Sequence, residues 1–350
     1  MNIAADATFR LTQFSHGGGC GCKIAPGVLT QLLADTPMRN LPKELLVGTE
    51  SSDDAAVYRL NDSQALVATT DFFTPIVDDP YDFGRIAATN ALSDIYAMGG
   101  HPIMALAIVG MPLDKLPVEV IRRILAGGES VCASAGIPIA GGHSIDVLEP
   151  IYGLVGLGLV HPERIKRNDR AQAGDVLILG KPLGVGILSA ALKKGKLTDA
   201  GYAQMIAATT QLNTPGTAMG ELPGVHAMTD VTGFGLAGHL LEICRGSRLG
   251  ASVHFDHLPI IDEARHWAEQ GTVTGATARN WDSYGREVRL PAGAPDWHRA
   301  LITDPQTSGG LLIACAADTE AQVLSEFAKH GFGAACRIGT MEAGQGLTVV

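Results

Sequence analysis

The sequence predicts a two-domain α/β (α+β) protein, and three observations lead to this prediction. The chain has 350 residues, of which 46% are hydrophobic and 18% charged, enough for two soluble domains of ordinary size. Strand-like and helix-like patterns alternate through both halves. The 43 glycines indicate many tight turns. We place a mobile glycine-rich segment at 1–45, an N-terminal domain at 46–170 and a C-terminal domain at 171–350.

In the N-terminal part, we expect one short helix over 24–36, begun by Pro26. The apolar runs 55–60 and 65–70, separated by Asn-Asp-Ser-Gln, predict a hairpin of two strands. A long helix should follow from Asp82 to Met98 and end at a Gly-Gly pair.

The rest of this half continues the alternation. Residues 117–136 begin with proline and predict a helix. Strands are expected at 103–110, 137–142 and 151–160, of which the first and the last should be buried; this gives the order β-β-α-β-α-β-β.

The second half repeats the alternation from residue 173 onward. We expect strands at 175–180, 224–230, 310–316, 334–339 and 347–350, and helices at 184–195, 202–222 (interrupted near Pro215) and 235–247. Residues 279–297 contain scattered Gly and Pro and predict a long irregular loop.

Charge and composition exclude several classes of protein. A net charge of −10 argues against a nucleic-acid partner, although a few lysines and a divalent cation can still offset one polyphosphate. No apolar run is long enough to cross a membrane, and we see no signal peptide. The six cysteines are mostly scattered, so a reducing cytoplasm is the expected location. P-loop, Rossmann and hydrolase-elbow motifs are absent.

Several aspartates lie next to predicted strands. Asp53 and Asp54 precede one strand, and Asp71 and Asp230 each end another. Loops at strand ends bind ligands in α/β folds, and carboxylate oxygens suit Mg²⁺. Each aspartate could instead cap a turn or a helix. That alternative is weakest for the Asp53-Asp54 pair, because adjacent carboxylates repel each other unless a cation is near.

Asp94 lies in a predicted helix of small and apolar residues, where burial of a carboxylate is costly without a partner. Asn90 lies on the same face, four residues earlier. We favour contact with a metal or a nucleotide over a structural pairing with Arg85 or a neighbouring backbone amide.

Two glycine-containing stretches could hold anions. "AGGHSID" reads as a turn in which His143 and Ser144 could donate to a phosphate or ribose. "DPQTSGGLL" (304–312) is of the same kind, although an ordinary turn before a strand explains it as well.

The run "SHGGGCGCK" places Cys20, Cys22 and Lys23 among glycines. We expect the glycines to leave the Cys20 sulfur uncrowded and Lys23 to favour its thiolate. Lys23 could equally contact a phosphate. The alternatives are a disordered tail and a metal site, but Cys-x-Cys is not the usual zinc spacing.

Together, "HGGGCGCK", "DDAAVY", "TTDFF", "FGRIAATNALSDIYAMGG", "AGGHSID", "MTDVTGFGLAGH" and "DPQTSGGLL" resemble the selenophosphate synthetase (selenide, water dikinase) family over nearly the whole chain. This resemblance implies the two-domain fold of the aminoimidazole ribonucleotide synthetase superfamily. It also implies a homodimer that shares ATP across its interface and makes selenophosphate, AMP and orthophosphate from ATP, selenide and water.

The resemblance further implies roles for individual residues. Cys20 is then catalytic and Lys23 aids phosphoryl transfer. The implied Mg²⁺ ligands are Asp54, Asp94 and Asp230, and the implied ATP site comprises Lys23, Ser51, Ser52, Asp53, Asp71, Asp94, Gly142, His143 and Ser144.

Two other functions stay open from the residues alone. Another ATP-dependent enzyme of the superfamily, such as a small-molecule kinase, would release ADP. A selenium or metal carrier using Cys20 and Cys22 would have no need of the aspartates.

Overall fold

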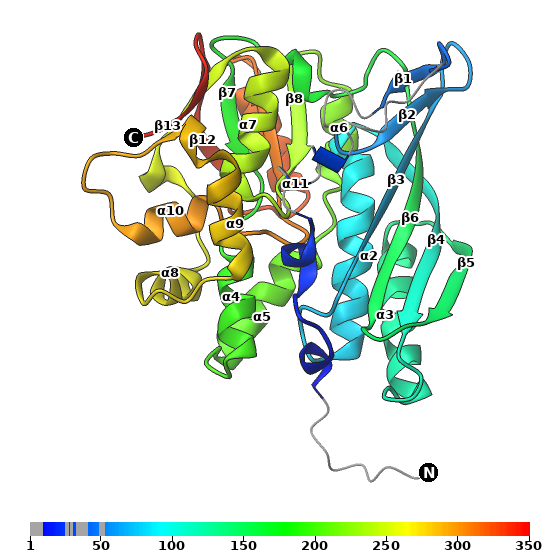
Figure 1. The fold of residues 1–350 in the computed structure, drawn as a ribbon. Helices are drawn as coiled ribbons and strands as arrows, with labels where there is room; N and C mark the ends of the chain where they lie inside the picture. The colour runs from blue at the N-terminus through cyan, green and yellow to red at the C-terminus, as the bar shows by residue number, and fades with distance from the viewer. Residues whose placement is uncertain (1–9, 25–27, 29–30, 33–40, 49–52) are drawn as a thin grey trace.

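A computed structural model describes residues 10–24, 28, 31–32, 41–48 and 53–350. Two mixed sheets with helices packed on them make up the molecule (Figure 1). The mixture of helices and strands confirms the predicted fold class. Most of the helix expected over 24–36 lies outside the described residues, although Val28, Gln31 and Leu32 are helical.

The first sheet has the strand order β1-β2-β3-β6-β4-β5. Its strands are β1 (Leu45–Val47), β2 (Ala56–Arg59), β3 (Ala65–Phe73), β4 (His101–Met111), β5 (Ile139–Asp146) and β6 (Ile151–Val160). The predicted hairpin is confirmed, since β2 and β3 pair antiparallel with Ala56 opposite Ala68. The expectation that the strands at 103–110 and 151–160 are fully buried is wrong, because one face of this sheet is open.

The second sheet has the strand order β10-β13-β9-β12-β7-β11-β8. Its strands are β7 (Val176–Leu179), β8 (Val225–Asp230), β9 (Gly250–Val253), β10 (Val288–Arg289), β11 (Leu311–Cys315), β12 (Cys336–Glu342) and β13 (Gly346–Val349). Every residue of β7 and β11 is buried, as expected for central strands covered on both faces.

The helices include all those predicted between residues 80 and 247. From residue 80 onward the helices are α2 (Pro80–Ala97), α3 (Val118–Ser134), α4 (Val185–Lys193), α5 (Asp199–Thr209), α6 (Pro215–Gly220), α7 (Gly235–Ser247), α8 (Asp262–Glu269), α9 (Gly275–Tyr284), α10 (Asp296–Ile302) and α11 (Glu320–Lys329). The interruption at Pro215 separates α5 from α6. The irregular loop predicted at 279–297 is wrong, because most of α9, the strand β10 and the start of α10 lie there.

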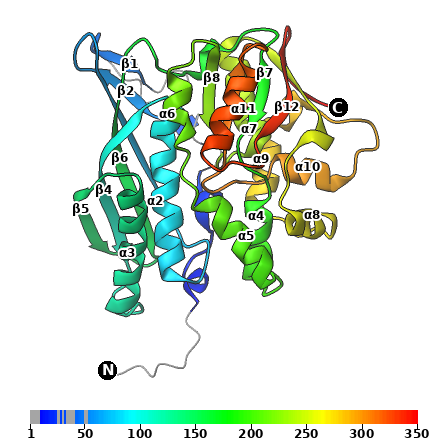
Figure 2. The same cartoon turned by 180° about the vertical axis from the view of Figure 1, so that it is seen from behind.

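Helix α2 lies between the two sheets (Figures 1 and 2). It begins with Pro80, and the Asp79 side chain caps it by accepting a hydrogen bond from the Asp82 amide (2.9 Å). On one side α2 packs against β3, β6 and α3, and on the other against β8, α5 and α6. Polar groups on α2 therefore lie within reach of both sheets.

Close packing of α2 on α3 depends on glycine. A Cβ added at Gly84 would lie 1.9 Å from the carbonyl oxygen of Ile124, and one at Gly127 would lie 2.1 Å from that of Tyr81. The small residues that the sequence places in α2 therefore permit a short distance between the helices. Among the described residues, no helix is both long and apolar enough to cross a membrane.

Candidate functional site

Three carboxylates from distant parts of the chain converge beside α2. Asp54 precedes β2, Asp94 lies on α2, and Asp230 is the last residue of β8. One oxygen from each lies within 4.8 Å of the others. The structure thus brings together the three aspartates for which the sequence analysis predicts metal binding.

Hydrogen bonding within the cluster is incomplete. The Thr229 hydroxyl donates to Oδ1 of Asp54 (2.7 Å), and the Thr69 hydroxyl donates to Oδ2 of Asp94. Oδ2 of Asp54 and Oδ2 of Asp230 are buried and have no partner among the described residues. Unpaired buried carboxylate oxygens are costly, and a divalent cation that prefers oxygen ligands would satisfy both.

The electrostatics of the cluster lead to the same conclusion. Burial, followed by the charge of Asp230, raises the pKa of Asp54 and of Asp94 well above the ordinary range. Burial also raises the pKa of Asp230, against the opposing hydrogen bond from Ser93. The three groups are difficult to ionise together without a cation, and their oxygens are suitable ligands for Mg²⁺.

A second network joins the N-terminal segment to α2. The Cys20 thiol donates to Oδ1 of Asn90 (3.2 Å), and the Asn90 amide donates to Oδ2 of Asp71 (2.5 Å). The Lys23 ammonium forms an ion pair with the same Asp71 oxygen (3.1 Å). Cys20, Lys23 and Asp71 are therefore linked through one asparagine side chain.

The expectation that the Cys20 sulfur is uncrowded is wrong. Cys20 is 1% exposed and lies in a short 3-10 helix, η2 (Gly19–Cys22). Its amide donates to the Thr307 hydroxyl (3.0 Å). Gly19 adopts φ of +54°, and a Cβ there would lie 2.4 Å from the Thr307 hydroxyl oxygen. The glycines permit close docking of Cys20.

Burial also reverses the expected ionisation of Cys20. Desolvation raises the pKa of the Cys20 thiol, and the nearby Lys23 charge offsets only part of that rise. In this docked arrangement Cys20 is a thiol, and a thiolate requires a more polar environment. Burial disfavours the Lys23 ammonium, but the negative charge of Asp71 outweighs burial, and the pKa of Lys23 lies well above its usual value.

The loop 304–310 supports the Cys20 turn, a role the sequence analysis did not assign. The Ser308 amide donates to Oδ1 of Asn90 (2.7 Å), and the Lys181 ammonium donates to the Ser308 carbonyl (2.9 Å). Asp304 accepts hydrogen bonds from the amides of Gly186 and Ile187. The "DPQTSGG" motif was the sequence signal that could have indicated a functional loop, but nothing in the sequence predicts that this loop contacts Cys20.

Other functional partners also escaped the sequence analysis. Thr69 and Thr229, which bond two of the clustered carboxylates, each lie one or two residues before an aspartate that the analysis singled out. Their position beside Asp71 and Asp230 was visible, but contact with Asp94 and Asp54 depends on how the sheets meet.

The remaining predicted ATP-site residues lie elsewhere in the chain or fall outside the described residues. Ser51 and Ser52 lie outside the described residues. Oδ1 of Asp53 accepts a hydrogen bond from the amide of Asn168 (2.7 Å), so this carboxylate is directed at the chain between the two sheets. The two adjacent aspartates therefore have different contacts: Asp53 bonds the amide of Asn168, and Asp54 joins the carboxylate cluster.

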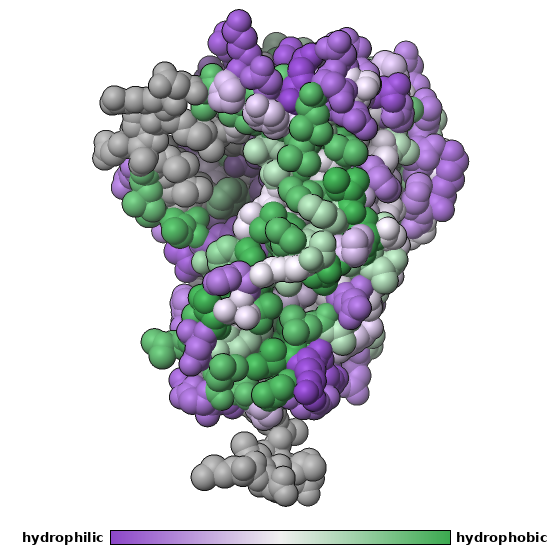
Figure 3. Space-filling view, turned by 90° about the vertical axis from the view of Figure 1, so that its right-hand side faces the viewer, coloured by the Kyte–Doolittle hydropathy of each residue, from purple (hydrophilic) through white to green (hydrophobic). Residues whose placement is uncertain are grey.

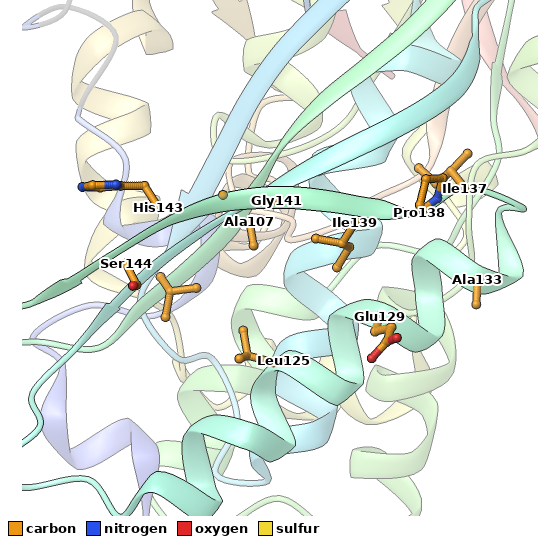
Figure 4. Close-up of a pocket in the computed structure, with 12 residues that line it drawn as sticks. Ala107, Leu125, Glu129, Ala133, Ile137, Pro138, Ile139, Gly141, His143 and Ser144 are labelled. Atoms are coloured by element: carbon orange, nitrogen blue, oxygen red, sulfur yellow. The ribbon is translucent and has the colours of Figure 1, made fainter.

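Residues 140–146 are strand rather than turn, which corrects the sequence analysis. Gly142, His143 and Ser144 lie in β5, the edge strand that pairs with β4. A Cβ at Gly142 would lie 2.1 Å from the carbonyl oxygen of Ala107 in β4, so glycine permits this close approach. Ser144 faces a cavity of about 660 Å³ beside α3, whereas His143 points away from α3 (Figure 4). Three strand spacings, roughly 14 Å, separate β5 from β3 and Asp71.

The chain belongs to the class of AIR synthase related proteins, because family models match both of its domains. The family model "AIR synthase related protein, N-terminal domain" matches residues 52–160, and the corresponding C-terminal domain model matches residues 172–350. Among solved structures, thiamine-monophosphate kinase from Stenotrophomonas maltophilia K279a is similar with a TM-score of 0.63 and 23% identity, over 92% of this chain and 95% of that one. Hydrogenase maturation protein HypE in complex with ATP is similar with a TM-score of 0.60 and 19% identity, over 95% and 89%. These similarities show the fold.

Sequence relatives narrow the class to one family. The selenide, water dikinase of Pseudomonas straminea is 66% identical over 98% of this chain and 96% of its own length. That of Rhizobium meliloti is 56% identical over 96% of both chains. The chain belongs to the selenide, water dikinase family.

Gly19→Ala should release the Cys20 turn, because alanine is strained at positive φ and its Cβ would collide with Thr307. We expect alkylation of Cys20, followed by peptide mass spectrometry, to accelerate about tenfold, as for a loss of roughly 1.4 kcal/mol of local docking. Gly21→Ala is the matched control, because its Cβ meets atoms only at 3.8 Å. Equal alkylation rates in the two variants would contradict the docked arrangement.

Proposed function

We propose that this chain makes selenophosphate from selenide, ATP and water, and releases AMP and orthophosphate. The chain is an enzyme, a selenide, water dikinase by family. The observation that carries the proposal in this structure is the position of the Cys20–Asn90–Asp71–Lys23 network directly beside the cluster of three carboxylates. A sulfur residue, a cation and a metal-binding cluster are then available at one phosphoryl-transfer site.

Asp54, Asp94 and Asp230 are proposed to hold Mg²⁺. Two orphaned buried oxygens and three carboxyl groups with raised pKa values fit a hard divalent cation. When bound, Mg²⁺ would neutralise charge on the ATP phosphates. The Thr69 and Thr229 hydroxyls hold two of these carboxylates in place through hydrogen bonds.

Lys23 and Cys20 are proposed to act on the transferred group. Lys23 stays protonated and can move its ammonium from Asp71 to a phosphoryl oxygen, where a cation stabilises developing charge. Cys20 is buried, so the docked turn excludes water from the reacting phosphoryl group before selenide arrives. Asp71 is placed to orient both residues and to meet the nucleotide.

A homodimer is proposed because the first sheet leaves an apolar face open. On β3, buried residues alternate with the more exposed Leu66, Ala68, Thr70 and Phe72. Phe72, Tyr58 and Ile103 are 45%, 40% and 39% exposed, and apolar side chains gather on this side of the molecule (Figure 3). A second copy of the chain is the occupant that would bury such a sheet face.

The same face carries His143. Strand pairing places Phe72, Gly153, Ile108 and His143 in one row across β3, β6, β4 and β5. Within one copy, Asp71 lies on the side of the sheet that faces α2, whereas His143 lies on the open side three strands away, so the two side chains do not converge on one site. The β5 strand of a second copy could supply its His143 to the first copy's nucleotide. We therefore place Gly142, His143 and Ser144 in an ATP site completed by the partner.

Phosphorus NMR of a reaction with ATP, Mg²⁺ and selenide tests the activity. We expect selenophosphate, orthophosphate and AMP, and we expect Asp54→Asn, Asp94→Asn and Asp230→Asn each to slow ATP turnover at least about a hundredfold. Asp175→Asn is the control for a buried aspartate outside the cluster, since Asp175 bonds His226. ADP as the only nucleotide product, or full activity in the three variants, would overturn the proposal.

Metal binding should also appear in the pH dependence of stability. A carboxyl group with a raised pKa in the folded state binds its proton more tightly there, so its stabilising effect is lost as pH rises from the ordinary carboxyl range through the raised pKa. Without Mg²⁺, the wild type should therefore lose stability relative to Asp230→Asn as pH rises above the ordinary carboxyl range.

Added Mg²⁺ should reverse this loss in the wild type and have little effect on Asp230→Asn. Thermal melts at several pH values, with and without Mg²⁺, measure both effects, and Asp175→Asn again serves as the control. A pH dependence identical in wild type and Asp230→Asn would argue against a shared charge cluster.

Phe72→Glu should convert the dimer to a monomer, because it buries a charge in the proposed interface. Sedimentation velocity should show half the mass, and ATP turnover should fall at least about tenfold since His143 of the second copy is lost. Val118→Glu is the control, because Val118 is 60% exposed at the start of α3, which packs on the other side of the sheet. A fully active monomeric variant would show that one protomer contains the whole site.

A further inference from the structure

A cavity of about 590 Å³ lies beside the Cys20 turn, whose Gly21 and Cys22 line it. Three elements line it: the N-terminal segment with Cys22 and Lys23, the end of α4, and the start of α9. The cavity is too large to be a packing defect, and the function proposed above does not use it.

The cavity wall is strongly basic in a chain of net charge −10. Lys23, Lys193, Lys194 and Arg279 line it, and the described lining residues include no Asp or Glu. Within the described residues, neither Lys194 nor Arg279 forms an ion pair. Glu149, outside the lining, bonds His16 and offsets part of the charge at that end.

The basic residues exceed what helix stability requires. Lys193 and Lys194 lie at the C-terminus of α4, where cations complement the helix dipole. That explanation leaves Lys23 and Arg279, which come from other elements. The N-terminus of α9, a helix of ten residues capped by Thr274, also faces the cavity and adds positive potential.

Two contacts connect this cavity to the proposed chemistry. Lys23 lines the cavity, and its ammonium reaches Asp71 in the network that holds the Cys20 thiol. Arg279 donates to the carbonyl oxygen of Gly21 (2.9 Å), the residue that follows Cys20. An anion in the cavity is therefore separated from Cys20 only by the η2 turn.

We propose that this cavity is an anion-binding vestibule through which selenide, as the hydrogenselenide anion, reaches Cys20. The inference rests on the proposed selenophosphate-forming activity. Hydrogen selenide is a monoanion at neutral pH, and the three carboxylates repel anions that approach from their side. Basic residues that concentrate the anion next to Cys20 would offset this repulsion and raise the rate of encounter.

Thiol labelling of Cys22 tests anion attraction without any catalytic assay. In a Cys20→Ser/Cys336→Ser background, Cys22 is the one partly exposed cysteine, since the other three are buried. The probes are a dianionic aromatic disulfide, 5,5′-dithiobis(2-nitrobenzoate), and the neutral 4,4′-dithiodipyridine. The ratio of their rates should fall about fivefold or more in Lys194→Gln/Arg279→Gln.

Lys115→Gln/Arg122→Gln is the matched control, because it removes the same charge from the surface near α3. This control should leave the ratio unchanged. Loss of the Arg279 hydrogen bond could open the turn and speed labelling of Cys22 by both reagents. The ratio of the two labelling rates cancels this effect, because the neutral reagent reports the opening alone. An equal ratio in both double variants would overturn the vestibule.

Steady-state kinetics with otherwise native cysteines then identify the anion. Lys194→Gln/Arg279→Gln should raise the KM for selenide about threefold or more, with the KM for ATP unchanged. A changed labelling ratio with an unchanged selenide KM, altered product inhibition by orthophosphate alone, or a raised KM for ATP alone would each overturn the assignment to selenide. If the wild type makes no selenophosphate, the proposed function fails and takes the selenide assignment with it, whereas the labelling ratio still decides whether the cavity attracts anions.

Discussion

Repulsion among three buried carboxylates is the constraint to which the rest of the site responds. Asp54, Asp94 and Asp230 approach within 4.8 Å in a region with little solvent, and two of their oxygens have no partner among the described residues. Such an arrangement costs free energy without a bound cation, so the surrounding packing has to hold it in place. That cost makes the cluster receptive to a divalent cation, because binding removes the repulsion and supplies the missing partners together.

Helix α2 is the element that makes this convergence possible. Its small residues let it pack closely between the two sheets, and it carries Asp94 toward the second sheet and Asn90 toward the N-terminal segment. A helix with larger side chains would separate β3 from β8 and disperse the carboxylates. Gly84 lets α2 pack closely on α3 and so contributes to the position of the helix that carries Asp94.

Local patterns predicted the elements well where one periodicity dominated, as in the β2–β3 hairpin, α2 and α7. They failed at 279–297, where tryptophan and tyrosine side chains stabilise short helices through tertiary contacts, as when Trp297 packs on Phe255. The aspartates of the cluster could be singled out because acidic residues beside apolar strands are unusual. Burial of Cys20 could not be predicted, since a glycine-rich run looks the same whether it is mobile or tightly docked.

Docking of the N-terminal segment and the charge of the carboxylates are thermodynamically linked. The Lys23 ammonium favours ionisation of Asp94 and of Asp230, so docking of Lys23 stabilises their charged forms. Linkage is reciprocal, and the charged carboxylates must therefore favour docking of the segment to the same extent. A cation bound at the cluster would weaken this attraction. Charge at the cluster and the position of Cys20 consequently form one coupled system, in which binding at one end changes the segment at the other.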